Sequence, residues 1–248
     1  MISEMNNMWV FLLLLPLVSI LYASVGHGGA SGYLALMALF SFSTEIMKPT
    51  ALLLNLCVAG VAFYHFYKSG NFKIKLFYPF AISSIPFAFV GSTLEIDPSL
   101  YKKILGALLL VAILKMLNVI KNKNTINRGT KLWQGILIGA VIGFFSGLIG
   151  IGGGIILTPI ILLFNWGNMK EAAAVSALFI WVNSAAGFIG HVSGGFLIQQ
   201  EMFILVIVAL IGGFLGSFYG SKKLNNTSLR YILAFVLTLA SIKLIVVK

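Results

Sequence analysis

Two glycine-rich segments of this chain have a composition and spacing suited to binding a ligand through backbone groups. The first reads GHGGASG over residues 26–32, and the second reads GLIGIGGG over residues 147–154. Because glycine has no side chain, a ligand can come close to the backbone N–H groups there. Where such a segment leads into a helix, unpaired N–H groups and the positive end of the helix dipole favour an anion. Both segments therefore predict anion binding without a charged side chain.

Polar side chains in and near these segments could add hydrogen-bond donors. His27 lies inside the first segment, where it could donate to an anion, titrate, or simply pack. Asn55 and Asn183 stand within apolar runs, where an amide either donates toward a cavity or bonds to a neighbouring helix. Ser31 and Thr158 offer hydroxyl groups, although helical hydroxyls often bond to their own backbone. The predicted binding residues are Gly28, Gly29, Ser31, Gly152, Gly153, Gly154, Asn55, Asn183, His27 and Thr158.

Composition predicts the surroundings in which these segments lie. Of the 248 residues, 59% are hydrophobic and 9% are charged, whereas a soluble domain has about 45–50% apolar and about 25% charged residues. So little charge cannot cover the surface of a water-soluble globule. The chain is therefore predicted to be an integral membrane protein whose partner is the lipid bilayer.

Apolar runs along the chain predict an all-α bundle of membrane helices. Most runs are long enough to cross a hydrocarbon core of about 30 Å. The runs that follow the glycine segments, near 27–42 and 152–166, are shorter. Each glycine-jointed pair therefore either crosses twice or forms a hairpin with its bend at membrane depth. The predicted runs lie near 9–24, 27–42, 50–67, 76–93, 100–118, 132–149, 152–166, 172–190, 202–220 and 228–247.

Charged residues predict how the chain is oriented. Lys and Arg number 17 against 6 Asp and Glu, which gives a net charge of +11. The basic residues gather in the gaps at 68–75, 121–131 and 222–230, whereas Glu95 and Asp97 share another gap. Since cytoplasmic loops are enriched in Lys and Arg, the basic gaps are predicted to face the cytoplasm and both termini the periplasm. Nucleic acid is not an expected partner.

The second half of the sequence repeats the first after a shift of 124 residues. Each half holds a glycine-jointed pair of runs and three further spans, which together make three or five crossings. An odd number of crossings turns the second copy upside down relative to the first. The aligned residues are Trp9 with Trp133, Gly26 with Gly150, Gly28 with Gly152, Gly29 with Gly153 and Phe40 with Phe164.

This repeat predicts a polytopic helix bundle of two inverted-topology repeats with 8–10 helical segments. Residues 1–120 would form the first repeat, residues 121–131 a cytoplasmic basic linker, and residues 132–248 the second repeat. Inverted repeats are typical of secondary transporters, which bind their solute near the midplane where the two copies meet. We therefore expect the two glycine segments to face each other there as a cradle for an anion.

Motifs for other kinds of chemistry do not occur in the sequence. It has no P-loop, no HExxH and no CxxC, and no Asp or Glu lies deep inside a predicted span. Enzymatic catalysis, ATP-driven transport, a metal site and a bound cofactor are therefore not expected.

The two glycine segments, with the later N-x(3–4)-G segments at Asn55–Gly60 and Asn183–Gly187, resemble the TauE/SafE family. This family comprises sulfite exporters and toluene-sulfonate uptake permeases, and the likeness covers nearly the whole chain. It implies a bacterial inner-membrane carrier for sulfite, organosulfonates or related sulfur oxyanions. An inside-negative potential favours outward movement of an anion by about 2.3 kcal/mol per charge per 100 mV, so export by alternating access is the expected direction, and uptake stays open as the alternative.

Two alternatives to an anion carrier remain open from the sequence. A bundle packed tightly at the glycines would suit a non-transporting membrane partner or assembly protein. Unwound carbonyl groups directed into a cavity would suit a carrier of a cation or a neutral solute. The sequence also leaves room for a homo-oligomer.

Overall fold

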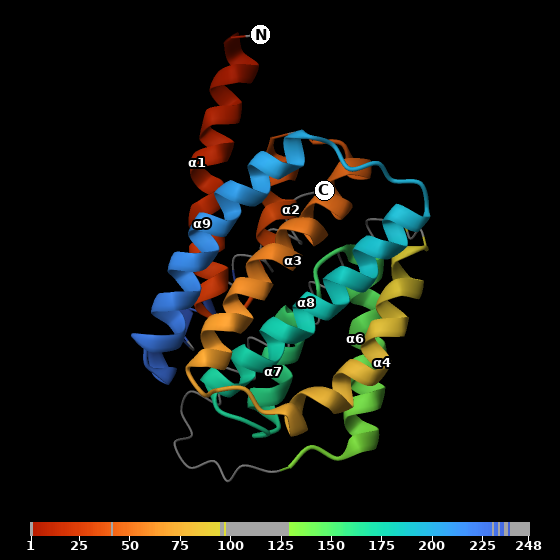
Figure 1. Ribbon diagram of the computed structural model, residues 1–248, viewed down its shortest axis with the longest axis vertical. Helices are drawn as coiled ribbons and strands as arrows, with labels where there is room; N and C mark the ends of the chain where they lie inside the picture. Colours follow the sequence, from red (N-terminus) through yellow and green to blue (C-terminus); the bar gives the residue numbers. More distant parts are fainter. Residues whose placement is uncertain are drawn as a thin grey trace.

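The structure is a computed structural model that describes residues 2–40, 42–94, 97, 129–229, 231–232, 234–235 and 238. Regular structure in these residues is helical throughout, as the composition predicts (Figure 1). The predicted runs near 100–118 and 228–247, and most of the linker, fall wholly or largely outside the described residues. The helices are α1 (Ile2–Ser24), α2 (Ala30–Leu39), α3 (Thr44–Lys68), α4 (Ile74–Ser92), α6 (Leu132–Ile149), α7 (Gly154–Leu163), α8 (Met169–Ser193) and α9 (Glu201–Lys222).

Five of these helices, α3, α4, α6, α8 and α9, are long and apolar enough to cross a membrane. The start of α8 precedes its predicted apolar run at 172–190, because a polar cap sets this helix boundary. Asn168 caps α8 by accepting from the backbone N–H groups of Lys170 and Glu171, at 2.9 and 3.1 Å. The Glu171 carboxylate accepts in turn from the Asn168 N–H at 2.9 Å. This capping box starts the helix before its apolar run.

Glycines determine how the outer pairs of long helices pack. Small residues at every fourth position let two helix backbones approach closely. Residue numbers rise together along both members of each pair, so α6 runs parallel to α4 and α9 runs parallel to α1 (Figure 1). The facing residues on α6 and α4 are Gly135 and Pro79, Gly139 and Phe80, Gly143 and Ser84, and Gly147 and Ala88; those on α9 and α1 are Gly212 and Pro16, Gly216 and Ile20, and Gly220 and Ser24.

The two longest helices, α3 and α8, cross at the centre of the bundle. Gly60 of α3 faces Trp181 of α8, and Gly187 of α8 faces Leu52 of α3. Since residue numbers rise along one helix as they fall along the other, the two helices are antiparallel. In each helix, a glycine thus packs against a large side chain of the other helix.

The short helices α2 and α7 have 10 residues each. Ten helical residues extend about 15 Å, half of the about 30 Å needed to cross the hydrocarbon core. We call α1 with α2 hairpin 1, and α6 with α7 hairpin 2. The ribbon places α2 toward the upper end of the view and α7 toward the lower end (Figure 1). Of the two arrangements compatible with the sequence, the helices therefore form hairpins of one long and one short arm.

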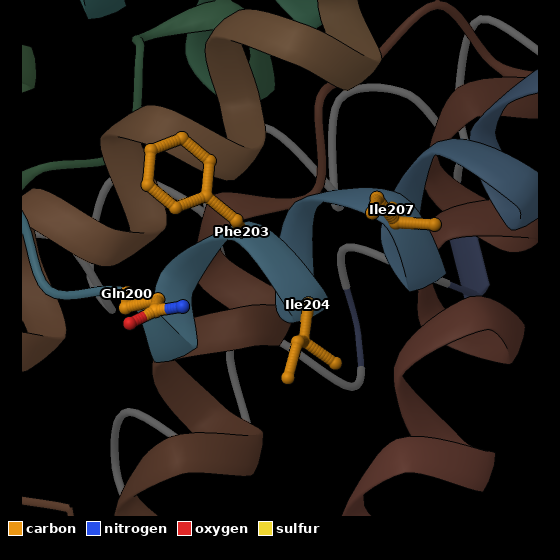
Figure 2. Close-up of a pocket in the computed structure, with 4 residues that line it drawn as sticks. All are labelled: Gln200, Phe203, Ile204 and Ile207. Atoms are coloured by element: carbon orange, nitrogen blue, oxygen red, sulfur yellow. The ribbon is translucent and has the colours of Figure 1, made fainter.

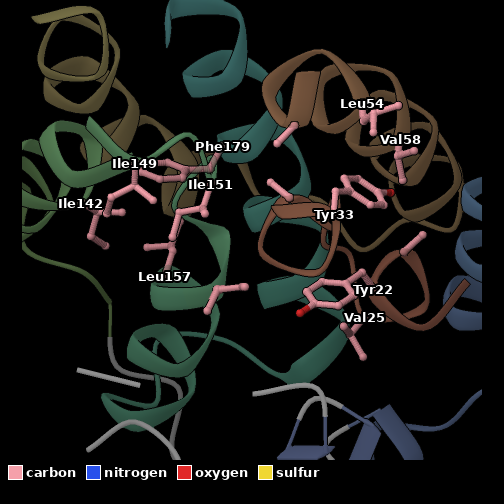
Figure 3. Close-up of a cluster of buried hydrophobic side chains, with 14 of the residues drawn as sticks. Tyr22, Val25, Tyr33, Leu54, Val58, Ile142, Ile149, Ile151, Leu157 and Phe179 are labelled. Atoms are coloured by element: carbon pink, nitrogen blue, oxygen red, sulfur yellow. The ribbon is translucent and has the colours of Figure 1, made fainter. Parts of the chain in front are cut away.

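One continuous cluster of buried apolar side chains joins the two hairpins to α3 and α8. Figure 3 shows Tyr33 of hairpin 1 beside Leu54 of α3, and Ile142 and Ile151 of hairpin 2 near Phe179 of α8. The bends of both hairpins thus lie inside a shared core. They are not loops on the surface.

The outer face of the bundle is apolar where it would meet lipid. Leu13 of α1 is 70% exposed and Ile207 of α9 is 61% exposed. A groove of about 470 Å³ runs along the start of α9, lined by Gln200, Phe203, Ile204 and Ile207 (Figure 2). Large exposed apolar side chains are expected on a surface that is covered by acyl chains.

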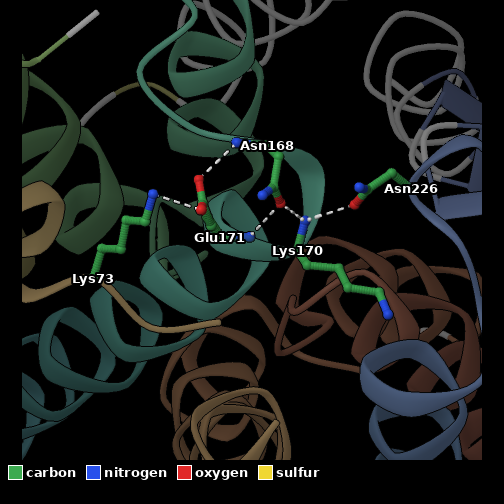
Figure 4. A network of polar contacts seen from close by, with 5 residues as sticks. All are labelled: Lys73, Asn168, Lys170, Glu171 and Asn226. Atoms are coloured by element: carbon green, nitrogen blue, oxygen red, sulfur yellow. Dashed lines mark hydrogen bonds and ion pairs between the residues drawn. The ribbon is translucent and has the colours of Figure 1, made fainter. Parts of the chain in front are cut away.

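Lysines gather at one end of the bundle. The Lys73 Nζ to Glu171 Oε1 ion pair spans 2.6 Å and joins the start of α4 to the start of α8 (Figure 4). Lys170 Nζ donates to the Ser221 carbonyl at 3.1 Å and joins α8 to the end of α9. Because α6 runs parallel to α4, its first residues lie at this end as well. The lysines in the loops and helix ends here are Lys68, Lys73, Lys75, Lys131, Lys170, Lys222 and Lys223.

Candidate functional site

The bend of hairpin 1, which we call joint 1 (residues 25–29), is unwound and closed by backbone hydrogen bonds. The His27 N–H donates to the Tyr22 carbonyl at 2.9 Å, and the Gly26 N–H donates to the Ala23 carbonyl at 3.0 Å. Gly26 and Gly29 have φ values of +77° and +99°, a region that side chains rarely allow. The chain then enters α2 at Ala30.

The bend of hairpin 2, joint 2 (residues 150–153), repeats this geometry. The Gly150 and Ile151 N–H groups donate to the Ser146 carbonyl at 2.9 and 3.3 Å. Gly150, Gly152 and Gly153 all have positive φ values, between +71° and +84°. The bond from Ile151 to Ser146 lies 124 residues after the bond from His27 to Tyr22, so the aligned segments share this hydrogen bond. They differ at Gly152, which has φ +71° whereas φ is not positive at its aligned mate Gly28.

The two joints meet at the side chain of Asn55, near the middle of α3. A Cβ atom added to Gly28 would overlap the Asn55 carboxamide oxygen, and one added to Gly152 would lie 2.5 Å from its nitrogen. The carboxamide thus fits between the two joints, in contact with both. Glycine is required at both positions because any side chain would displace Asn55.

The Asn55 carboxamide forms three hydrogen bonds to residues that flank these glycines or lie on α8. Its Oδ1 accepts from the Ala30 N–H, the first amide of α2, at 3.1 Å. Its Nδ2 donates to the Ile151 carbonyl of joint 2 at 3.3 Å and to Ser184 Oγ of α8 at 3.1 Å. The side chain is completely buried. One carboxamide therefore connects the start of α2, joint 2 and α8.

His27 reaches from joint 1 into the second half of the chain. Its Nε2 lies 3.4 Å from Thr158 Oγ1 on α7, and Thr158 Oγ1 donates to Ser176 Oγ of α8 at 2.7 Å. All three side chains are buried. Two of the predicted binding residues, one from each half, thus come together in one polar cluster.

Each joint also packs on the long central helix of the other half. A Cβ on Gly26 would overlap the backbone of Ala173 near the start of α8, and one on Gly150 would lie 3.4 Å from Lys48 of α3. Both joints therefore lie between α3 and α8. A movement of one central helix relative to the other would change the contacts of both joints.

Several buried polar atoms have no hydrogen-bond partner within the described part of the chain. Burying an unpaired polar group costs free energy, so such groups mark places where another molecule could bind. Four of them belong to side chains of which at most 1% is exposed. These atoms are His27 Nδ1, Thr50 Oγ1, Ser146 Oγ and Asn183 Oδ1.

The helix starts at the two joints differ in how they are capped. The first N–H of α2 is bonded to Asn55, whereas Gly153 at the start of α7 makes no side-chain cap. The first N–H groups of a helix have no partner within it.

Glu171 is the one buried acidic or basic side chain, histidine aside, among the described residues, and it lies at the lysine-rich end. The joints therefore offer neutral N–H and O–H donors.

The remaining predicted residues make local contacts. Ser31 Oγ pairs with Tyr22 Oη at 2.9 Å inside hairpin 1. Asn183 Nδ2 donates to the Phe179 carbonyl of its own helix at 2.7 Å. Sequence reasoning did not single out Ser176 or Ser184, which face the joints. Their spacing of eight residues along α8, on the same helical face, is a signal that could have indicated them.

Comparisons with known proteins agree on one family. A family model described as "Sulfite exporter TauE/SafE" matches residues 11–244. A "Probable membrane transporter protein" of Sinorhizobium fredii is 37% identical over 232 residues, which cover 92% of this chain and 94% of the relative. Similarly named proteins of Methanocaldococcus jannaschii and Bacillus subtilis are 28% and 26% identical, over 92% and 87% of this chain and 94% and 90% of the relatives. No solved structure gives a significant match.

Proposed function

This chain belongs to the TauE/SafE family and is a membrane transporter, not an enzyme, and from that premise we propose that it exports sulfur oxyanions. The substrate class is sulfite, organosulfonates or related anions, and the membrane is the bacterial inner membrane. Transport proceeds by alternating access, with the anion bound at the glycine joints. No cofactor takes part.

The observation that carries this proposal is the meeting of two unwound glycine joints around Asn55, next to the starts of α2 and α7. A helix start presents N–H groups and a positive dipole end, which bind an oxyanion without a formal charge. Non-helical backbone at membrane depth is tolerated where it is buried in protein or lines a cavity. The residues proposed to line this site are Gly28, Gly29, Ser31, Gly152, Gly153, Gly154, Asn55, Asn183, His27 and Thr158.

The start of α7 favours an anion over a cation, because two carbonyl groups beside it are already bonded and no side chain caps its first turn. The Ile151 carbonyl already accepts from Asn55, and the Gly153 carbonyl accepts from Leu157 in the first turn of α7. The start of α7, in contrast, has no side-chain cap. A cation would need the carbonyl oxygens that these bonds use.

The proposal includes two inverted repeats, residues 1–120 and 132–248, joined by the linker at 121–131. The symmetric packing of the helices supports it: α1 on α9 matches α6 on α4, and both pairs are parallel. At the central crossing, Gly60 against Trp181 matches Gly187 against Leu52. Exchange of the two halves would map the helices of each pair onto those of the other pair, although the glycines lie on α6 in one pair and on α9 in the other.

The proposed orientation places the lysine-rich end in the cytoplasm and both chain termini in the periplasm. Lys and Arg are enriched in cytoplasmic loops. The start of α1 lies at the opposite end of the bundle from the α3–α4 loop, which contains Lys68 and Lys73 (Figure 1). An inside-negative membrane potential assists outward movement of an anion by about 2.3 kcal/mol per charge per 100 mV, whichever way the protein is oriented.

Purified protein in proteoliposomes tests the proposal directly. Vesicles loaded with sulfite, sulfoacetate, taurine or sulfate should release at least one of these solutes faster than protein-free vesicles do. An inside-negative potential should accelerate release of the anionic solute. Thermal unfolding of the purified protein should shift upward with the same solute. If none of the four moves or stabilises the protein, the proposed substrate class is wrong.

A further inference from the structure

The Asn55 carboxamide occupies the place at the start of α2 where an anion would bind. Its oxygen accepts from the Ala30 N–H at 3.1 Å, and an anion bound at this helix start would need the same donor. The side chain comes from α3, 25 positions further along the chain, and it fits against Gly28 of joint 1. In the anion-free protein, the first half of the cradle is therefore closed by a neutral acceptor.

The nitrogen of the same carboxamide forms hydrogen bonds with the second half of the chain. Its nitrogen donates to the Ile151 carbonyl of joint 2 and to Ser184 of α8. Since all three hydrogen bonds belong to one planar group, the oxygen cannot leave Ala30 by rotation without disturbing the two bonds of the nitrogen. The start of α2 is thus mechanically connected to joint 2.

The second half has no equivalent device in this structure. Asn183 is the aligned asparagine of α8, but its nitrogen bonds to Phe179 of its own helix and its oxygen has no partner among the described residues. Gly153 leaves the start of α7 without a side-chain cap. The two helix starts therefore differ in that only α2 is held by an asparagine from the neighbouring helix.

Resting on the proposed function, we propose that Asn55 is a latch: an arriving anion displaces its carboxamide oxygen from α2, and the same displacement frees joint 2 and α8. The anion first meets the uncapped start of α7 and then competes with Asn55 for the start of α2. An anion forms stronger hydrogen bonds with N–H donors than a neutral amide does, so it can win this competition. Substrate binding thereby loosens the contact between the two halves.

The central test is Asn55→Ala in purified protein, with sulfite as the probe. Removing the competing oxygen should tighten sulfite binding about three- to tenfold, the equivalent of one hydrogen bond. The initial transport rate should fall, because binding no longer triggers the release of joint 2. A purely structural role for Asn55 predicts that affinity and rate fall together. Asn183→Ala should weaken sulfite binding, so the two asparagine substitutions should act in opposite directions.

A milder variant covers the case in which Asn55→Ala does not fold. Ser184→Ala removes one acceptor of the Asn55 nitrogen but leaves the Ala30 contact in place. It should tighten sulfite binding about twofold, in the same direction. Ser193→Ala is the matched control, since this exposed serine bonds only to the Ile189 carbonyl of its own helix. Its affinity and rate should equal those of the wild type.

Hydrogen exchange separates failure of the latch from failure of the proposed substrate. Without any anion, Asn55→Ala should raise amide exchange in both joints, around residues 27–33 and 150–155. If exchange rises in neither joint, or if sulfite binds the variant no more tightly than the wild type, the latch is wrong. Exchange that rises in both joints, while the wild type binds no sulfite, would support the connection between the joints. The same result would contradict the proposed substrate and the competition between the anion and Asn55 for α2.

Discussion

The two hairpins share an aligned backbone hydrogen bond at the turn, from His27 to Tyr22 and from Ile151 to Ser146, but join their arms differently. Hairpin 1 is closed by two pairs of buried hydroxyl groups that bridge α1 and α2. Ser19 Oγ lies 2.8 Å from Tyr33 Oη, and Tyr22 Oη lies 2.9 Å from Ser31 Oγ. Because each hydroxyl has its partner on the other arm, these four hydroxyl groups of hairpin 1 satisfy each other.

Hairpin 2 lacks these pairs, because the positions 124 residues later carry different side chains. Gly143 and Leu157 are the residues that align with the first hydroxyl pair of hairpin 1. Ser146 and Ile155 stand where it has the second, so the Ser146 hydroxyl faces an apolar mate and has no partner among the described residues. Hairpin 2 directs its remaining hydroxyl, Thr158, away from its own long arm toward α8.

This contrast teaches that similar turns can serve different purposes. Hairpin 1 is internally bonded and its short arm is capped by Asn55, which suits a rigid wall that is already closed. Hairpin 2 has an uncapped short arm and an unpaired hydroxyl, which suits the side where an anion first binds. Substitutions at the start of α7 should therefore affect transport, whereas loss of the Ser19–Tyr33 hydroxyl pair in hairpin 1 should affect stability.

The largest expected effect comes from a side chain in joint 2. Gly153→Leu should reduce transport to background while leaving the protein in the membrane. Its Cβ would lie 2.6 Å from Ile142 and 3.0 Å from Phe179, so the side chain would block the approach to the first N–H groups of α7. Flux in proteoliposomes measures this directly.

Gly70→Leu is the matched control for the backbone cost of that substitution. Gly70 has φ +74°, almost the same as the +75° of Gly153, and nothing lies within 4 Å of its added Cβ. Both variants carry the cost of about 1–2 kcal/mol for a left-handed residue, but only Gly153→Leu should stop transport. Equal loss of flux in both variants would show that strain, rather than blocked N–H groups, is responsible.

A smaller loss is expected at the contact between the halves. Thr158→Val keeps the shape of the side chain but removes the hydroxyl between His27 and Ser176. Sulfite affinity should fall about three- to tenfold, the usual value of one hydrogen bond. Thr93→Val is the control, because this exposed threonine bonds only to the Val90 carbonyl of its own helix. A titration that gives equal affinities for the two variants would contradict a binding role for Thr158.

The backbone of the joints could be predicted from the sequence better than the contacts around them. Positive φ at Gly150 and Gly153 requires glycine, so the glycines themselves reveal the turns. The partners of Asn55 could not be predicted, because Ile151 and Ser184 lie 96 and 129 positions away and meet it only through the helix crossing. A serine that faces a site looks the same in sequence as one that bonds to its own helix.

The Ser19–Tyr33 hydroxyl pair of hairpin 1 should contribute stability and leave anion affinity unchanged. Tyr33→Phe removes the hydroxyl that meets Ser19 and leaves the ring in the core. The free energy of unfolding should fall by about 1 kcal/mol, as for a typical buried hydrogen bond. Thermal unfolding in nanodiscs measures the loss. If Tyr33→Phe changed sulfite affinity as much as Thr158→Val does, the two hairpins would not differ in their roles in stability and binding.

The smallest expected effect is a change in unfolding temperature, and its sign differs between a buried serine without a described partner and one with a partner. Ser146→Ala removes a buried hydroxyl without a described partner, so without anion the variant should unfold at the same temperature as the wild type or slightly higher. Ser217→Ala, the partnered control, loses hydrogen bonds to His65 at 2.7 Å and to the Gly213 carbonyl at 2.6 Å and should unfold at a lower temperature. With sulfite present, Ser146→Ala should gain less stability than the wild type, because the hydroxyl lies beside the uncapped start of α7. A lower unfolding temperature for the anion-free Ser146→Ala variant would mean that this serine is already satisfied, and hairpin 2 would then be as closed as hairpin 1.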